Sequence, residues 1–239
     1  MPTVNTTLDQ PRISSNQLGE FVFSSPTRKY RILQDQKFGN KFTSPYYKPA
    51  LDAILQSFDG RDFNLLELIV SRSAIEARPA KHRNQAARWS NNATMLRCFA
   101  DLASRARPPA GNNQVVRQNA LIDLSGVTIS VRPEIITRQP NGLFSYTKLR
   151  FSKSKVSEDA SEIVLLLLLK FGQRRSQDGT QIDPSNTKLV DCFARAVIEG
   201  HTLQRIREQQ LDAALSEIAG LWPTVRPSAT QIKSMQLSR

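Results

Sequence analysis

Apolar residues recur every three or four positions through the first half of the chain, which is the spacing of a helix that buries one face. The helices predicted from this spacing cover residues 49–60, 64–77 and 84–106. Asn64 can cap the second helix, and Pro79 ends it. The face of that helix predicted to be buried contains Leu65, Leu68, Ile69 and Ser73. A run of Pro, Gly and Asn over 108–113 then breaks the helical pattern.

Alternating apolar and polar positions open the second half of the chain and predict strands. The predicted strands cover residues 119–138 and 143–153. A turn is expected at Ser125-Gly126 and a tighter one at 140–142. The helix predicted over 157–171 is apolar on nearly every side, so we expect it to be buried against the sheet. The remaining predicted elements are a strand with a bend over 188–200 and an amphipathic helix over 203–222.

This order of elements predicts an α/β or α+β fold, with a small, mostly antiparallel sheet and one buried helix, preceded by a helical N-terminal region. The predicted regions are a flexible tail over 1–20, a basic helical region over 21–110, a sheet-plus-helix core over 111–222 and a flexible tail over 223–239. A boundary near Pro108 and a single domain with an N-terminal helical cap fit the pattern equally well.

Charge adds an expectation about partners. The 239 residues include 33 Lys and Arg against 21 Asp and Glu, a formal net charge of +12, which favours contact with a polyanion such as nucleic acid. The longest apolar run, 163–169, has seven residues, whereas a membrane-spanning helix needs about 20. The chain also begins without the basic head and apolar run of a signal peptide. We therefore expect a cytoplasmic protein with no membrane partner.

Cysteine and histidine positions argue against several kinds of chemistry. Cys98 and Cys192 lie in apolar-periodic stretches and predict buried thiols rather than a disulfide. His82 and His201 share no metal-ligand spacing with them, so no zinc site is expected. The sequence also contains no phosphate-binding glycine loop and no nucleophile elbow. The residues alone therefore predict no cofactor.

Basic residues gather into clusters that we take as candidate nucleic-acid contacts. The cluster in the helical region contains Arg72, Arg78, Lys81, Arg83 and Arg88. The other two contain Lys148, Arg150, Lys153 and Lys155, and Arg174 and Arg175. For each cluster the alternative is a helix or strand face that is merely solvated. Over 21–48, aromatic residues interleave with basic ones, and they either stack on bases or, as we favour, pack a cap onto the core.

Pro133-Glu134 and Lys148 lie on neighbouring predicted strands, and the order of elements over 121–195 is similar to the core of the PD-(D/E)xK, or restriction-endonuclease-like, superfamily. The resemblance implies acids that hold magnesium and a lysine that assists attack on a phosphodiester. The chain departs from the motif, because Tyr146 stands in place of the second acid and the first acid is Glu rather than Asp. The acids that could replace the missing one are Glu162 first, then Glu158 and Asp123.

Three functions fit this sequence. Nucleic-acid binding, on a degenerate nuclease-like core, is favoured because basic residues are plentiful and suitably placed carboxylates are few. The second is a magnesium-dependent nuclease in which Glu134, Lys148 and Glu162 act, the two acids as metal ligands. The third is a non-enzymatic assembly or regulatory subunit that binds an acidic protein partner. In the non-catalytic cases, Glu134 and Lys148 are expected to form a cross-strand ion pair on the wet face of the sheet.

Overall fold

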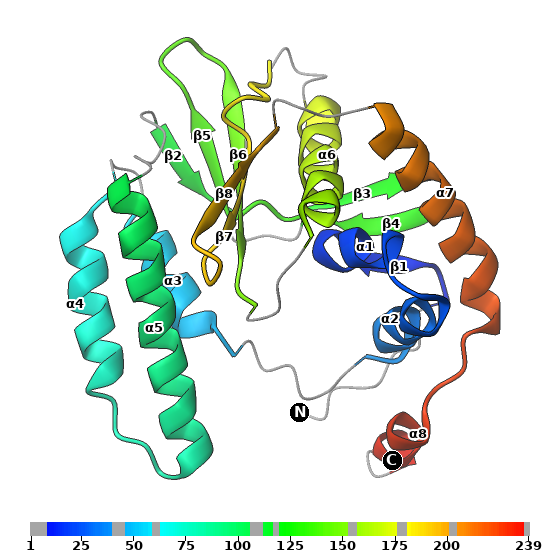
Figure 1. The fold of residues 1–239 in the computed structure, drawn as a ribbon, viewed down its shortest axis with the longest axis horizontal. Helices are drawn as coiled ribbons and strands as arrows, with labels where there is room; N and C mark the ends of the chain where they lie inside the picture. Colours follow the sequence, from blue (N-terminus) through cyan, green and yellow to red (C-terminus); the bar gives the residue numbers. More distant parts are fainter. Residues whose placement is uncertain are drawn as a thin grey trace.

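A mixed five-stranded sheet forms the centre of the computed structural model (Figure 1), in which α-helices and β-strands are combined as the sequence predicts. The structure describes residues 9–39, 46–58, 63–105, 112–116, 120–152, 157–175, 181–200 and 205–236. Across the sheet the strands are, in order, β2 (Asn112–Val115), β5 (Ile135–Arg138), β6 (Phe144–Arg150), β7 (Lys188–Asp191) and β8 (Ala196–Glu199). Neighbouring strands are antiparallel, except that β6 and β7 are parallel.

Helix α6 (Glu158–Arg175) makes the crossover that a parallel pair of strands requires. Ser157 caps its start, because the backbone N–H of Ala160 donates to Oγ of Ser157 at 3.2 Å. Nearly every residue from Ala160 to Gly172 is buried. The prediction of a helix buried against the sheet is therefore confirmed.

A second, three-stranded sheet lies beside α6 and includes the beginning of the described chain. Its strands are, in order, β1 (Arg12–Ser14), β4 (Val127–Ser130) and β3 (Leu121–Leu124). The helices around it are α1 (Ser15–Val22), α2 (Pro26–Phe38) and α7 (Arg205–Leu221). The hairpin from β3 to β4 turns at Ser125 and Gly126, both with positive φ, as the sequence predicts.

The opposite face of the five-stranded sheet is covered by three helices, α3 (Lys48–Gln56), α4 (Leu65–Glu76) and α5 (Arg83–Arg105). Leu149 and Val190 point from the strands into this layer, whereas Tyr146 and Leu189 point toward α6. Both faces of the five-stranded sheet are therefore covered by helices (Figure 1). Among the described helices, none is both long enough and apolar enough to cross a membrane.

The ends of the chain differ from the tails that the sequence predicts. In the tail predicted over 1–20, Ile13 and Leu18 are fully buried, because β1 pairs in parallel with β4 and α1 packs on α6. In the tail predicted over 223–239, Val225 is fully buried, and helix α8 (Ala229–Gln236) follows it. Each end gains its structure from segments far away in the sequence.

Three further differences concern single elements. Strand β2 begins at Asn112, inside the segment predicted only to break a helix, because it pairs with β5. The predicted strand over 188–200 is the hairpin of β7 and β8. Helix α4 buries Leu68 and Ile75, while Leu65 and Ile69 are exposed. The reason is that only the side of α4 that faces α5 and α3 is packed.

The basic helical region predicted over 21–110 divides between two places. Phe21 and Ile32 of the first two helices belong to the core around α6 and α7. Helices α3 to α5 form the layer on the other side of the five-stranded sheet. Helices α2 and α3, which are neighbours in the sequence, therefore lie on opposite sides of the sheet, and no local sequence pattern predicts this.

Candidate nucleic-acid interface

Glu134 and Lys148, the residues on which the nuclease resemblance rests, meet in the interior of the protein. Lys148 lies on β6 and Glu134 immediately precedes β5, and Nζ and Oε1 are 3.8 Å apart. The side chain of Lys148 is 7% exposed and that of Glu134 9%. The ion pair is present as expected, but the wet face predicted for it is wrong, because both faces of this sheet are covered.

Backbone groups hold both members of the pair. Nζ of Lys148 donates to the carbonyl oxygens of Val131 at 3.0 Å and Arg132 at 2.9 Å. The backbone N–H of Leu149 donates to Oε2 of Glu134 at 2.7 Å. Because Arg132 has a positive φ of 33°, these bonds fasten a strained stretch of backbone against β6. The ion pair and these hydrogen bonds therefore link the segment that precedes β5 to strand β6.

Burial gives the Glu134 carboxyl an unusual pKa. Loss of solvation raises this pKa above its ordinary value of 4.5, and the nearby Lys148, the N–H of Leu149 and Arg132 oppose the rise. A buried carboxylate of this kind is stabilised by its partners and destabilised by their loss.

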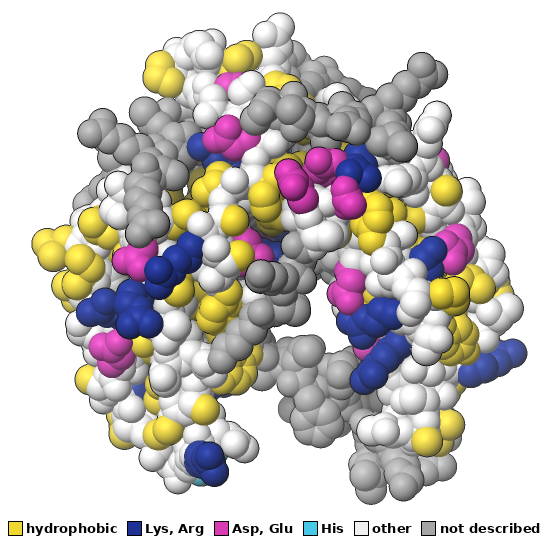
Figure 2. All heavy atoms as spheres, viewed as in Figure 1, with side chains coloured by type: hydrophobic (Ala, Val, Ile, Leu, Met, Phe, Trp, Pro, Cys, Tyr) yellow, Lys and Arg dark blue, Asp and Glu magenta, His cyan; other side chains and the backbone are white. Residues whose placement is uncertain are grey.

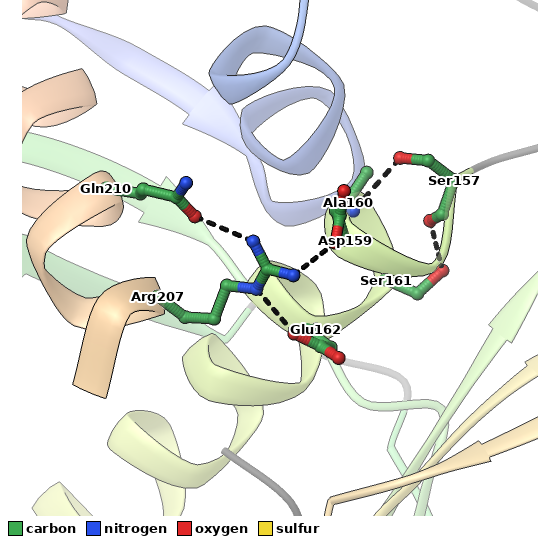
Figure 3. A network of polar contacts seen from close by, with 7 residues as sticks. All are labelled: Ser157, Asp159, Ala160, Ser161, Glu162, Arg207 and Gln210. Carbon is green, nitrogen blue, oxygen red and sulfur yellow. Dashed lines mark hydrogen bonds and ion pairs between the residues drawn. The ribbon is translucent and has the colours of Figure 1, made fainter. Parts of the chain in front are cut away.

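The predicted second acid, Glu162, is engaged elsewhere (Figure 3). Nε of Arg207, on α7, donates to Oε2 of Glu162 at 2.5 Å, and the same guanidinium contacts Asp159 and Gln210. Figure 3 shows this network on the side of α6 that faces α7, where it fastens the two helices together. Within the described ranges, no three or more His, Cys, Asp or Glu residues are grouped so that they could hold a metal ion.

The second predicted basic cluster also lies largely inside the fold. Arg150 is 8% exposed, and its Nη1 contacts Oδ2 of Asp191 on β7 at 2.6 Å. Lys148 is held as described above, so neither side chain forms part of an open basic surface. Lys153 and Lys155 lie outside the residues that the structure describes.

The first predicted cluster is different, because it lies at the free end of the hairpin formed by α4 and α5. Arg78 and Lys81 lie in the connection between these helices and Arg83 begins α5, and all three are exposed. Within the described part of the chain, none of these three side chains takes part in an ion pair. Arg72, on the last turns of α4, lies 3.8 Å from Glu76. Figure 2 shows basic side chains over this hairpin, including its end.

Aromatic rings lie among these basic side chains. The guanidinium of Arg78 lies 5.2 Å from the ring centre of Trp89, and that of Arg88 lies 5.6 Å from Trp89 and 6.0 Å from Tyr46. Nε1 of Trp89 donates to the carbonyl oxygen of Pro79 at 3.3 Å, which fixes the ring against the connection. We call Tyr46, Arg78, Lys81, Arg83, Arg88 and Trp89 the hairpin-end surface. Trp89 was not predicted as a site residue, although its position next to Arg88 was a signal for it.

A pocket of about 290 Å³ opens beside this surface, between α3, α4 and α5. Among the described residues that line it, Lys48, Arg78 and Arg88 are basic and Asp52 is acidic. Nζ of Lys48 contacts Asp52 at 2.5 Å, so that carboxylate is already neutralised. Among these described lining residues, the basic side chains therefore outnumber the acidic one.

The third predicted cluster is exposed but does not join the hairpin-end surface. Arg174 and Arg175 end α6, whereas Figure 1 shows the connection between α4 and α5 at the opposite end of the molecule. Of the aromatic segment over 21–48, Phe21 is fully buried in the core, which is the packing that we expected, while Tyr46 is 39% exposed. Cys98 and Cys192 are free, buried thiols, as predicted.

Comparison with known proteins adds no assignment to this geometry. No protein-family model matches the chain, and no curated protein matches it either.

Proposed function

We propose that the protein binds nucleic acid through the hairpin-end surface, and that its five-stranded sheet serves as a scaffold without a catalytic role. The observation that carries the proposal is the exposure of Arg78, Lys81 and Arg83 at one end of the α4–α5 hairpin, without an ion-pair partner among the described residues. Cationic side chains of this kind displace counterions from phosphates, which drives binding to a polyanion.

We infer a scaffold role for the sheet because β5, β6, α6 and β7 follow one another in the order on which the PD-(D/E)xK resemblance is based. A nuclease would need Lys148 and a second acid to be available to substrate and metal. Lys148 instead donates to two backbone carbonyls, and Glu162 is bound by Arg207. These contacts favour binding over cleavage.

The test is fluorescence anisotropy with the full chain and short labelled probes: single-stranded DNA, duplex DNA and single-stranded RNA. Binding should persist in EDTA, and its affinity should fall steeply between about 50 and 200 mM salt. The triple variant Arg78→Gln, Lys81→Gln, Arg83→Gln should reduce the salt dependence, by about 0.9 in the logarithmic slope for each lost contact with duplex DNA. Arg226→Gln is the matched control, because Arg226 is exposed near α8, away from the hairpin.

The outcomes separate the three functions. Unchanged binding in the triple variant, or no binding to any probe, would refute the proposal. A stable complex with an acidic protein and none with nucleic acid would favour an assembly subunit. Magnesium-dependent cleavage that Lys148→Ala abolishes, in a variant whose circular dichroism spectrum is unchanged, would establish the nuclease instead.

A further inference from the structure

We infer that the hairpin-end surface is built for single-stranded nucleic acid, with an unpaired base stacking on the platform formed by Tyr46, Arg78, Arg88 and Trp89. The inference rests on the proposed function and adds the class of ligand. It starts from a combination that phosphate binding alone does not need, namely aromatic rings among the basic side chains.

The rings and guanidinium groups provide flat surfaces at one place. Arg78 lies over Trp89 at 5.2 Å, and Arg88 lies within 6.0 Å of the ring centres of both Trp89 and Tyr46. Bases of single strands stack on aromatic rings and on arginine planes, whereas bases within a duplex have both faces covered by their neighbours. A platform of this composition therefore distinguishes unpaired from paired bases.

The platform is also fixed in place before a ligand arrives. The indole N–H of Trp89 is bonded to the carbonyl of Pro79, and the hydroxyl of Tyr46 accepts a hydrogen bond from Asn91 at 2.7 Å. Tyr46 nevertheless keeps 39% of its surface exposed. Trp89 is half-buried. A ring that is held in position loses little conformational freedom when a base stacks on its exposed part.

The size of the adjoining pocket points in the same direction. At about 290 Å³ it lies near the lower limit of about 300 Å³ for small-ligand sites. A space of this size is on the scale of one small ligand and is too small to enclose a double helix. Arg78 lines the pocket and also belongs to the platform, so one side chain can contact the phosphate of a nucleotide whose base is stacked.

Tryptophan fluorescence tests the stacking directly. The chain has two tryptophans, and Trp222 is 2% exposed, so a ligand at the hairpin-end surface changes the emission of Trp89. Unlabelled oligothymidine should quench this emission, and a duplex of the same length should not. Trp89→Phe should abolish the quenching. Tyr46→Leu should weaken the affinity for oligothymidine by about tenfold, which is typical for loss of one stacking partner.

Two controls make the result specific. Tyr46→Phe keeps the ring and removes only the hydroxyl, so it should bind oligothymidine like the parent protein. Arg226→Gln should leave both quenching and affinity unchanged. Because Tyr46 lies at the surface, these variants keep the test decisive even where Trp89→Phe does not fold.

The possible failures are distinct. If the duplex binds as tightly as oligothymidine and Trp89 emission does not change, the inference is overturned while the proposed nucleic-acid binding stands. If neither probe changes anisotropy or emission, the proposed function fails as well. Equal loss of affinity in Tyr46→Phe and Tyr46→Leu would also overturn the inference, because the aromatic face would then contribute nothing.

Discussion

Replacing Lys148 with methionine keeps a long side chain and removes its ammonium group. Lys148 is 6% exposed, and its Nζ has two carbonyl acceptors and the carboxylate of Glu134 as partners. Removing one member of a buried pair costs roughly 3–5 kcal/mol, since the other charge stays buried without compensation. That is a large share of the roughly 5–15 kcal/mol by which a typical domain is stable. Lys148→Met should therefore unfold at much lower urea concentration.

The loss should depend on pH, with a definite sign. Burial raises the pKa of Glu134 above 4.5, so its contribution to stability is fully present below that value and is lost as the pH rises through the folded-state pKa. Lys148 opposes the rise, so without it the pKa of Glu134 is higher still. Lys148→Met should consequently be more destabilised at about pH 8 than at about pH 5.

Urea denaturation followed by circular dichroism at both pH values measures these effects. The double variant Glu134→Gln, Lys148→Met should regain part of the lost stability, because no buried charge remains. Its stability should also depend much less on pH, because the titrating carboxyl of Glu134 is gone. Lys48→Met is the exposed control: Lys48 pairs with Asp52 at 58% and 50% side-chain exposure, and its loss should change stability by less than about 1 kcal/mol. An unfolding midpoint in Lys148→Met equal to that of the parent protein would refute the structural role of the lysine.

Three further predictions concern other parts of the fold. Leu68→Ala should cost about 2–5 kcal/mol in urea denaturation and Leu66→Ala less than about 0.5, because Leu68 is 1% and Leu66 68% exposed; similar losses would contradict the observed packing of α4. Cys192 should not react with a thiol reagent until the protein unfolds, because its side chain is buried and burial is the main cause that raises the pKa of the thiol. Rapid labelling of Cys192 in the native protein would contradict this prediction. Arg207→Met should lower stability by about 1.5–3 kcal/mol through loss of its bond to Glu162, and an unchanged urea midpoint would show that Arg207 does not fasten α6 to α7.

Elements that local pattern and local hydrogen bonds specify could be predicted from the sequence. Helix α5 and buried helix α6 follow the apolar spacing, and the turn between β3 and β4 follows Ser125-Gly126. Strands β1 and β2 could not be predicted in the same way. Each is short, and each exists because it pairs with a strand distant in sequence, β1 with β4 and β2 with β5. Such pairing leaves little mark on the composition of the strand itself.

The residues of the candidate site also differ in whether the sequence alone could place them. Lys148 and Arg150 alternate with apolar residues, a pattern that predicts a solvent-facing strand when one face of a sheet is open. In this protein helices cover both faces, and the same pattern places the two cations in the core, beside Glu134 and Asp191. The basic residues at the end of the α4–α5 hairpin could be predicted, because a helix connection is exposed whatever the sheet is packed against.

We do not expect an acid at position 146, where the PD-(D/E)xK pattern would place one, to create a nuclease site. Tyr146 occupies the place of the missing acid, is 2% exposed and packs edge-on against Phe171 of α6 at 5.7 Å. Gly172 leaves room for the ring, since a Cβ there would lie 2.6 Å from it. Tyr146→Asp would exchange this packing for a buried carboxylate, with a loss of at least about 3 kcal/mol. We therefore expect the variant to unfold at lower urea concentration and to show no magnesium-dependent cleavage. A stable Tyr146→Asp protein that cleaves DNA would contradict this expectation and show that the sheet can hold an active centre.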